Sequence, residues 1–212
     1  PNTTSGFSIG TCAGLATNND TLGHGLGAVP KMIIVKNTQA TGNWFVYHAS
    51  LGNTKRLYLN ATDASTTSTI WNNTTPTSSV FTMKGGDFAT GEPLVFYAFA
   101  DVQGFSKFGS YTGNGNADGT FVYTGFKPAF VITKASSASG QGWHMQDNKR
   151  DGFNYDNKRL FANSSDSESG TTRMDLLSNG FKYRDGDGNG NGITYIYMAF
   201  AEQPLVGDNP AT

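Results

Sequence analysis

Acidic and amide side chains alternate with glycine in the stretch DGDGNGNG at residues 185–192. Asp185, Asp187 and Asn189 occupy the first, third and fifth positions of an EF-hand-like calcium loop. The twelfth position of such a loop is a bidentate Glu, but here it is Ile196 inside an apolar run. The sequence therefore predicts a glycine-rich hairpin loop between two strands, with Asp185, Asp187 and Asn189 as a calcium candidate. No other metal and no cofactor are expected.

The histidines and the acidic residues of the second half are the other side chains that could support catalysis. His24, His48 and His144 have no partner at the HxxxH or HExxH spacing of zinc sites. There is no GxSxG elbow, and no Lys-Ser/Thr pair follows the glycine-rich run GNGNADG at 113–119, which predicts a hairpin turn instead. A glycosidase needs two carboxylates across a cleft, and the acidic residues lie in loop-like sequence. We therefore expect no enzymatic activity, with these carboxylates as the catalytic alternative: Asp147, Asp151, Asp156, Asp166 and Glu168.

The composition suits an extracellular or virion protein of the all-β class. Charged residues make up 15% of the 212 residues, against roughly 25% in an average soluble domain, and the formal net charge is −1. Nucleic-acid binding needs clustered Lys and Arg, so no nucleic-acid partner is expected. The single cysteine, Cys12, excludes an intrachain disulfide and a Cys-based zinc site. No apolar run reaches the roughly 18 residues of a membrane span, so no membrane insertion is expected.

Short runs rich in β-branched and aromatic residues alternate with Gly, Asn, Asp, Ser and Thr along the whole chain. This pattern is typical of strands separated by turns. No window of a dozen residues has the apolar periodicity of a helix. The spacing favours sandwich or barrel sheets. The expected strands are 31–36, 43–48, 55–60, 79–84, 93–100, 121–126, 129–134, 180–185 and 193–201.

The second half of the chain repeats the first. The run HGLGAVPKMIIVK at 24–36 returns as VYTGFKPAFVITK at 122–134, with the proline and the last lysine in the same places. A repeat of about 100 residues indicates two copies of one domain. Further anchors follow in the same order, namely GFS at 6–8 and 104–106, Trp44 and Trp143, KRLYLN at 55–60 and KRLFAN at 158–163, Phe81 and Phe181, and YAFAD at 97–101 and MAFAE at 198–202.

These observations predict the fold class and its boundaries. We expect two tandem homologous antiparallel β-sandwich domains, jelly-roll-like, at residues 1–103 and 104–204. A C-terminal tail or linker is expected at 205–212. Large aromatic residues at the anchor positions are expected in the two cores, and these are Trp44, Trp143, Phe81, Phe181, Phe99 and Phe200.

Several motifs together resemble a module of tailed-bacteriophage virion proteins. They are GHGLGAVPKMIIVK (23–36), WFVYHASLG (44–52), LYLNATDA (57–64), GFSKFGSYTGNGNADGTFVYTGFKPAFVITK (104–134) and YIYMAFAEQP (195–204), and the resemblance covers about residues 5–204. It implies a structural or adhesive role at the surface of the virion, with other virion proteins as partners. It implies no established enzymatic activity and no defined functional residues. For a tail fibre a homo-oligomer is expected, with a trimer favoured because three chains around an axis make a stiff rod.

The two copies differ in length in two loops. The segment 144–159 is four residues longer than its counterpart in the first copy, and the segment 61–80 is three residues longer than its counterpart in the second. Insertions settle in surface loops, which often carry recognition. Exposed aromatic rings there can stack on sugars while Asn and Arg bond the hydroxyls. The alternative is that these rings pack inward and anchor the loops. The candidate recognition residues for a host glycan or protein are Trp71, Asn72, Arg150, Phe153 and Tyr155.

Three functions follow from this description. The favoured one is a tail-fibre component that contributes to host-surface attachment. The alternative is a capsid decoration or another structural appendage protein without receptor binding. A more distant alternative is an enzyme that degrades host glycans. The chain begins at Pro1 without a Met or a signal-like segment, so we expect a processed or excised part of a longer polypeptide.

Overall fold

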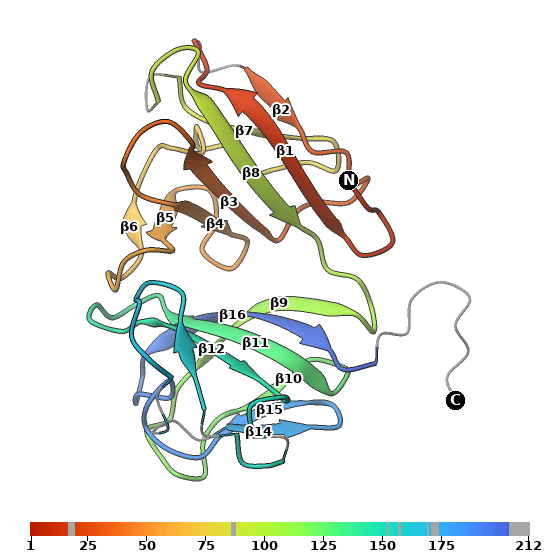
Figure 1. The fold of residues 1–212 in the computed structure, drawn as a ribbon, viewed down its shortest axis with the longest axis vertical. Coiled ribbons are helices and arrows are strands. Elements are labelled where there is room, and N and C mark those ends of the chain that lie inside the picture. The colour runs from red at the N-terminus through yellow and green to blue at the C-terminus, as the bar shows by residue number, and fades with distance from the viewer. Residues whose placement is uncertain are drawn as a thin grey trace. The chain divides into compact units, whose positions relative to one another are not determined.

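A computed structural model describes residues 1–16, 20–85, 88–151, 153–156, 158–168, 170 and 174–203 of the chain. Within these residues the secondary structure consists of strands joined by turns (Figure 1), which confirms the all-β prediction. The same residues contain no helix that could cross a membrane. The chain divides into two compact units, one of Pro1–Ala61 with Ser65–Asp101 and one of Thr62–Ala64 with the chain from Val102 onward. The predicted tail at 205–212 lies outside the described residues.

The first unit has a six-stranded and a two-stranded antiparallel sheet. The larger sheet has the order β1-β8-β3-β4-β5-β6, and the smaller pairs β2 with β7. Along β8 buried and half-exposed side chains alternate, as a strand with one covered face requires. The strands are β1 (Phe7–Ala13), β2 (Thr21–Gly23), β3 (Met32–Asn37), β4 (Phe45–His48), β5 (Lys55–Tyr58), β6 (Thr66–Thr67), β7 (Val80–Thr82) and β8 (Pro93–Phe99).

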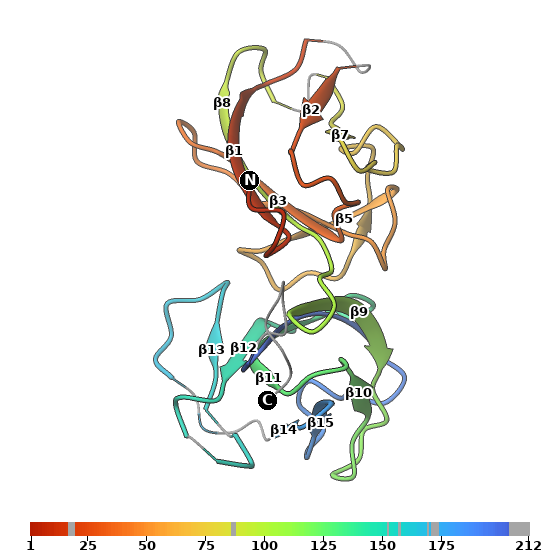
Figure 2. The same cartoon turned by 90° about the vertical axis from the view of Figure 1, so that its right-hand side faces the viewer.

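Buried apolar side chains from both sheets form the core of the first unit. Phe81 on β7 meets Phe96 on β8 edge to face, with ring centroids 5.3 Å apart. Both rings belong to one buried cluster that also contains Ile33 and Val35 of β3. Figure 2 shows β1, β3 and β8 on one side of this unit and β2 and β7 on the other. Phe81 therefore lies in the core, as the sequence predicts.

The second unit has a five-stranded sheet, β13-β12-β11-β16-β9, and a three-stranded sheet, β10-β15-β14. Phe181 on β15 meets Tyr197 on β16 edge to face at 5.5 Å, and both belong to the buried cluster of this unit. The strands are β9 (Ser106–Thr112), β10 (Phe121–Tyr123), β11 (Pro128–Ala135), β12 (Trp143–Asp147), β13 (Leu160–Phe161), β14 (Met174–Leu177), β15 (Gly180–Tyr183) and β16 (Thr194–Ala201).

Both units follow one strand order. In each, the first strand pairs with the last, the last with the third, the third with the fourth and the fourth with the fifth. The second strand pairs with the penultimate strand in the other sheet. The first strand of each unit also has a glycine opposite an aromatic ring of the last strand: Gly10 opposite Phe96, and Gly109 opposite Tyr197. A Cβ atom at Gly10 would lie 2.5 Å from Phe96, and one at Gly109 would lie 2.7 Å from Tyr197, so each glycine makes room for the ring.

Candidate functional site

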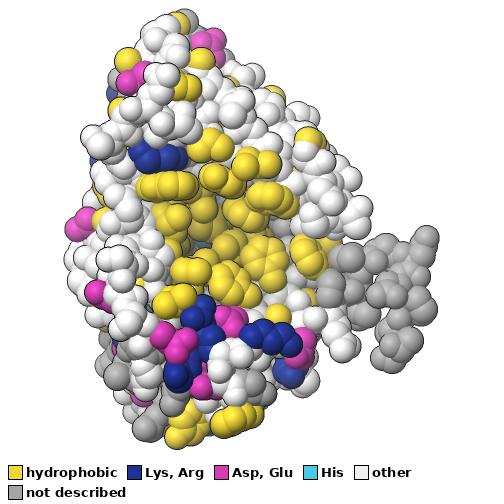
Figure 3. Space-filling view, in the orientation of Figure 1, with side chains coloured by type: hydrophobic (Ala, Val, Ile, Leu, Met, Phe, Trp, Pro, Cys, Tyr) yellow, Lys and Arg dark blue, Asp and Glu magenta, His cyan; other side chains and the backbone are white. Residues whose placement is uncertain are grey.

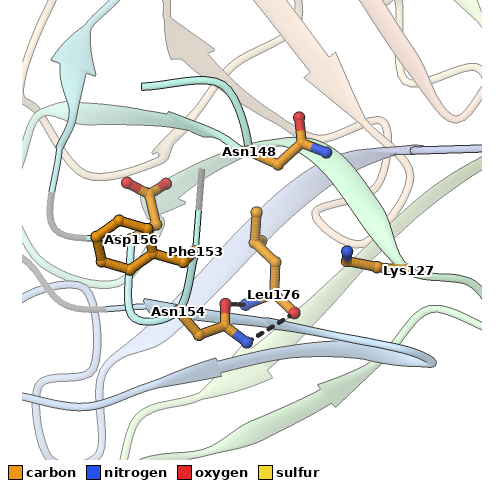
Figure 4. A pocket seen from close by; sticks show the side chains of 6 residues that line it. All are labelled: Lys127, Asn148, Phe153, Asn154, Asp156 and Leu176. Atoms are coloured by element: carbon orange, nitrogen blue, oxygen red, sulfur yellow. Dashed lines mark hydrogen bonds between the residues drawn. The ribbon is translucent and has the colours of Figure 1, made fainter. Parts of the chain in front are cut away.

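A cavity of about 150 Å³ lies against the β12–β13 loop of the second unit, within the segment that is longer in the second half of the sequence (Figure 4). At roughly 30 Å³ per water molecule, this volume holds about five waters. It therefore accommodates one small ring or polar group rather than an extended ligand. Four of its lining residues belong to the β12–β13 loop, namely Asn148, Phe153, Asn154 and Asp156. The other two are Lys127, which directly precedes β11, and Leu176 of β14.

Two residues of the loop hold it against β14. The Asn154 side-chain amide bonds both backbone polar groups of Leu176: its Nδ2 donates to Leu176 O at 3.1 Å and its Oδ1 accepts from Leu176 N at 2.9 Å. Asp156 pairs with Met174 through two backbone hydrogen bonds of 2.8 and 2.9 Å. Figure 4 shows the Asn154 side chain meeting the backbone of Leu176. These four bonds fix the loop residues that line the cavity.

Of the predicted recognition residues in this loop, one lines the cavity. Phe153 has 77% of its surface exposed and belongs to the lining. Tyr155 is 46% exposed and does not line the cavity. Arg150 is engaged in ion pairs with Asp147 at 2.6 Å and Glu168 at 3.1 Å, which brace the loop. The structure therefore offers Phe153 as the aromatic side chain that a ligand in the cavity can contact.

The charged side chains around the loop are largely paired with one another. Lys158 pairs with Glu168 at 2.9 Å, and Lys127 pairs with Glu202 at 2.8 Å. Glu202 also accepts a hydrogen bond from Asn148 at 2.7 Å. Hydrogen bonds from these lysines hold the pKa values of Glu168 and Glu202 below the usual range. Figure 3 shows Lys and Arg side chains interleaved with Asp and Glu side chains on the second unit, with neither sign dominating.

Asp156 is the buried carboxylate of the lining, with 2% of its surface exposed. Its Oδ1 accepts from Lys158 N at 3.0 Å, whereas its Oδ2 has no hydrogen-bond partner among the described residues. Gln146 donates to Asp156 O at 3.3 Å, and its Oε1 likewise has no partner in the described part of the chain. Burial raises the pKa of Asp156 to about 6. The carboxyl therefore takes up a proton at mildly acidic pH.

The predicted recognition residues of the first unit do not form a surface site. Trp71 is 1% exposed and belongs to the core cluster, where it meets Tyr47 edge to face at 5.7 Å. Its indole N–H donates to Lys55 O at 3.0 Å, so the polar end of the ring is satisfied inside the fold. Asn72 follows in a turn at φ 51°, a conformation that Asn tolerates better than most residues. The prediction of an exposed Trp71 is therefore wrong, because the ring anchors its loop.

The stretch DGDGNGNG is a crossing between sheets rather than a hairpin. It connects β15 of the three-stranded sheet to β16 of the five-stranded sheet, and these strands pair with other neighbours. The run 113–119 makes the corresponding crossing from β9 to β10, so the predicted hairpin turn there is also wrong. The two crossings bond to each other, for example Gly115 N to Asn189 O at 2.7 Å and Gly192 N to Gly113 O at 2.9 Å.

Asn189 of the calcium candidate joins the two crossings through its side chain. Its Oδ1 accepts from Asn114 N at 3.1 Å and from Thr120 N at 3.4 Å, so this oxygen faces N–H donors and not a cation. Asp187 is ion-paired with Arg159. Asp185 Oδ1 accepts from Asp187 N at 3.1 Å, so each of the three candidate side chains has a bond within the fold. No group of three His, Cys, Asp or Glu side chains suited to a metal ion occurs in the described part of the chain.

Each of the three histidines contacts other residues of the fold in the part of the chain that the structure describes. His24 contacts Thr77 O at 3.1 Å, and its Nδ1 accepts from Leu26 N at 3.2 Å. His48 Nδ1 accepts from Ser50 N at 3.2 Å. His144 is buried beside Arg159, and burial together with this cation lowers the pKa of His144 to about 4. The ring of His144 is therefore neutral at pH 7.

A second hollow, on the first unit, involves a residue that the sequence places in the core. Trp44 is half-buried, lies outside the core cluster and is stacked with Tyr97 of β8. Both rings line an open groove of about 790 Å³. The sequence indicates that Tyr97 points away from the core. Side chains alternate between the two faces of a strand, so in PLVFYAFA Tyr97 lies on the face opposite Phe96. Phe99 and Phe200 are also half-buried rather than core residues.

Comparison with known proteins identifies one family. The model of a domain of unknown function, DUF7483, matches residues 1–204 and so spans both units. No curated protein and no solved structure matches the chain.

Proposed function

The chain belongs to the DUF7483 family of domains of unknown function, and we propose that it is a bacteriophage virion protein that contributes to host-surface attachment. The tail fibre is the favoured location. This proposal rests on the resemblance of its motifs to virion proteins and on a cavity that suits a sugar. Its partners are other virion proteins and a saccharide of the host surface.

The observation that carries the attachment role is the exposed Phe153 ring on a cavity with polar walls. Ligand sites combine an apolar surface with a few placed polar groups. Phe153 supplies the apolar face on which the C–H side of a sugar ring can lie. Asn148 and Lys127 each bond Glu202, but the amide oxygen of Asn148 and the other N–H groups of the Lys127 ammonium can bond its hydroxyls. The cavity volume of about 150 Å³ suits a single sugar ring at the end or in a branch of a glycan.

We propose a binding role rather than a catalytic one. Glycoside hydrolysis uses two carboxylates on either side of the bond. Asp156 is the one acidic residue in the described lining of the cavity. Asp147 directs both oxygens to residues of its own loop, accepting from Lys149 N, Arg150 N and Arg150 Nε. Among the described lining residues, Asp156 therefore has no second carboxylate with which to form the pair that the glycan-degrading alternative needs.

The repeated strand order supports the inference that the two units are copies of one domain. The pairing of first with last strand, and of second with penultimate strand in the other sheet, is nested as in a jelly roll. The third to fifth strands form a meander instead. We infer two tandem homologous jelly-roll-like sandwiches, and a trimer of chains as the assembled form in a fibre.

Binding to an array of bacterial surface polysaccharides tests the attachment role. The labelled full-length chain should bind at least one polysaccharide saturably. Phe153→Ala should weaken that binding about tenfold, because it removes the apolar face of the site. Tyr123→Ala is the matched control, since Tyr123 is an exposed aromatic residue of the same unit, 64% exposed and outside the cavity lining.

Two outcomes would overturn this proposal. An array without saturable binding would favour the alternative, a capsid decoration or another appendage protein that binds virion proteins only. Gold-labelled antibody against the chain should mark the tail tips of phage particles, and labelling confined to the head would also favour decoration. Release of reducing ends from a bound polysaccharide, lost in Asp156→Asn, would show an enzyme instead.

A further inference from the structure

The open groove of the first unit lies between the loop that joins β3 to β4 and the last strand, β8. Its volume of about 790 Å³ falls within the range of about 300 to 1,000 Å³ typical of ligand sites. It is about five times the volume of the cavity in the second unit. The loop side of the groove is residues 37–42, and the remaining lining residues are Lys36, Trp44, Val95 and Tyr97.

Two aromatic rings form the apolar part of the groove. Trp44 and Tyr97 have ring centroids 6.4 Å apart and planes only 24° from parallel. Neither ring belongs to the core cluster, so the hydrophobic core does not explain why these positions are aromatic. The backbone of Trp44 is fixed by its N–H bond to Asn60 Oδ1 at 2.9 Å and by Leu59 N donating to its carbonyl at 3.0 Å. The rings therefore make a preorganised surface.

The loop beside these rings is held by its own hydrogen bonds. Asn37 Oδ1 accepts from Gln39 N at 2.9 Å and from Ala40 N at 3.0 Å. Lys36 Nζ donates to Ala40 O at 2.8 Å, so the cation of the groove is directed to a carbonyl of the loop. Thr38 Oγ1 donates to Pro93 O at 3.1 Å, which ties the loop to β8. The shape of the groove therefore does not depend on a ligand.

Three polar groups of the groove remain available to a ligand. The indole N–H of Trp44, the hydroxyl of Tyr97 and the side-chain amide of Gln39 form no hydrogen bond with any described residue. They provide donors and acceptors beside an apolar ring surface, which is the combination that a sugar chain requires. Lys36 is the one charged residue among the described lining, and its ammonium donates to the loop carbonyl of Ala40, so the groups that face a ligand are mainly neutral.

We propose that the groove floored by Trp44 and Tyr97 binds a neutral oligosaccharide. The pyranose C–H faces lie on the two rings, and the hydroxyls bond Gln39, the Tyr97 hydroxyl and the Trp44 indole N–H. A proline-rich peptide fits less well, because a ring inserted between two others needs two contact distances of about 3.5 to 4 Å each. The 6.4 Å between the centroids leaves no such slot. This groove shares no lining residue with the cavity at Phe153. The proposal does not depend on whether the chain is a virion protein.

Tryptophan fluorescence of the full-length chain reports on this groove selectively. Trp71 and Trp143 are each 1% exposed, so Trp44 is the tryptophan that aqueous acrylamide reaches. Hexasaccharides of glucose, mannose and N-acetylglucosamine serve as neutral probes. At least one should shift the emission saturably and protect Trp44 from quenching. Absence of any change at millimolar concentration, or tighter binding of an acidic hexasaccharide or a proline-rich decapeptide, would overturn the proposal.

Calorimetry on variants locates the binding. Trp44→Ala and Tyr97→Ala should each bind the active hexasaccharide about tenfold more weakly, because each loses one ring face. Trp44→Phe and Tyr97→Phe keep a ring and should lose less. Tyr123→Ala, in the second unit, should bind as the wild type does. Wild-type affinity in both alanine variants, with unchanged circular dichroism, would overturn the proposal. Loss of polysaccharide-array binding in Phe153→Ala with intact hexasaccharide binding would separate the two sites.

Discussion

At the scale of single residues, Asp156 combines a structural and a chemical role. Its backbone pairs with Met174 and fixes the β12–β13 loop, while its carboxyl is buried and one of its oxygens has no partner among the residues that the structure describes. A buried acceptor without a donor costs about 1 to 3 kcal/mol. Gln146, whose Nε2 donates to the backbone O of Asp156, has a second such acceptor in its Oε1. Protonation of the Asp156 carboxyl converts one of its oxygens into a hydrogen-bond donor. Burial favours this neutral form and raises the pKa of Asp156 to about 6.

The substitution Asp156→Asn tests this role through the pH dependence of stability. The carboxyl has a pKa near 3.8 when unfolded and about 6 when folded, so the wild type loses stability as pH rises from about 4 to 6. The amide cannot ionise and keeps an oxygen for Lys158 N. We expect the variant to gain about 1 to 2 kcal/mol over the wild type at pH 8 and little at pH 4. Urea unfolding at both pH values measures the difference. Equal effects at the two pH values would contradict it.

The sequence predicts Phe153 and Trp71 by one argument, but only Phe153 is exposed. Both are aromatic residues in segments of unequal length. The two residues differ in the partners they find. Trp71 donates its indole N–H to Lys55 O and packs against Tyr47, whereas the Phe153 side chain has no polar group that could form such a bond. Whether a loop ring turns inward depends on a partner far away in the sequence, so composition and spacing do not decide it. The cavity beside Phe153 depends on Leu176 and Lys127 in the same way.

At the scale of elements, the glycine-rich crossings replace what the sequence predicts as hairpins. Alternating glycine and polar residues are typical of tight turns, and the sequence does not tell which sheet the following strand joins. The glycines serve close packing here. Gly188 has φ +81°, and a Cβ there would lie 2.5 Å from the ring of Tyr183. Asn189 is fully buried, and its amide donates to Asn114, Asn116 and Asp185.

The substitution Asn189→Ala should destabilise the second unit by about 1 to 3 kcal/mol, because it removes the hydrogen bonds that a buried side chain makes to the backbone N–H groups of Asn114 and Thr120 and to acceptors of both crossings. Asn191→Ala is the matched control, since Asn191 lies two residues away in the same crossing and is exposed. The control should change stability by less than about 0.5 kcal/mol. Thermal unfolding measures both. A wild-type Tm that rises with calcium and falls with EDTA would contradict the hydrogen-bonding role of Asn189.

Strands rich in aromatic and β-branched residues could be predicted, whereas β1 and β9 could not. Their sequences, FSIGTCA and SKFGSYT, are rich in Gly, Ser and Thr and carry little strand preference of their own. Each lies at the edge of its sheet and pairs along its length with the apolar last strand. The glycines that weaken the local pattern, Gly10 and Gly109, are required by the rings of Phe96 and Tyr197. These two segments therefore form strands because they pair with the last strand of their unit, and not because of their own sequence preference.

At the scale of the whole molecule, the internal repeat is the most informative part of the sequence. Repeated anchors predict two similar β-sandwich domains, and the structure has two compact units with the same strand order. The anchors mark core positions in Phe81, Phe181 and Trp143, but not in Trp44. A repeat reports what the two halves share. The cavity lies against a loop that is longer in the second half, and the groove lies beside the β3–β4 loop of the first, so the lining of both had to come from the structure.

Matched core substitutions test whether the two units keep separate cores. Phe81 on β7 and Phe181 on β15 are fully buried on the penultimate strand of each unit, and each contacts the last strand of its own unit edge to face. Each Phe→Ala change should cost about 3 to 5 kcal/mol. Hydrogen exchange of the full-length chain should rise in the strands of the substituted unit and stay unchanged in the strands of the other. The double variant should show the sum of the two patterns. Loss of protection in both units from either single change would contradict this prediction, because it would show that the two buried clusters unfold as one cooperative unit.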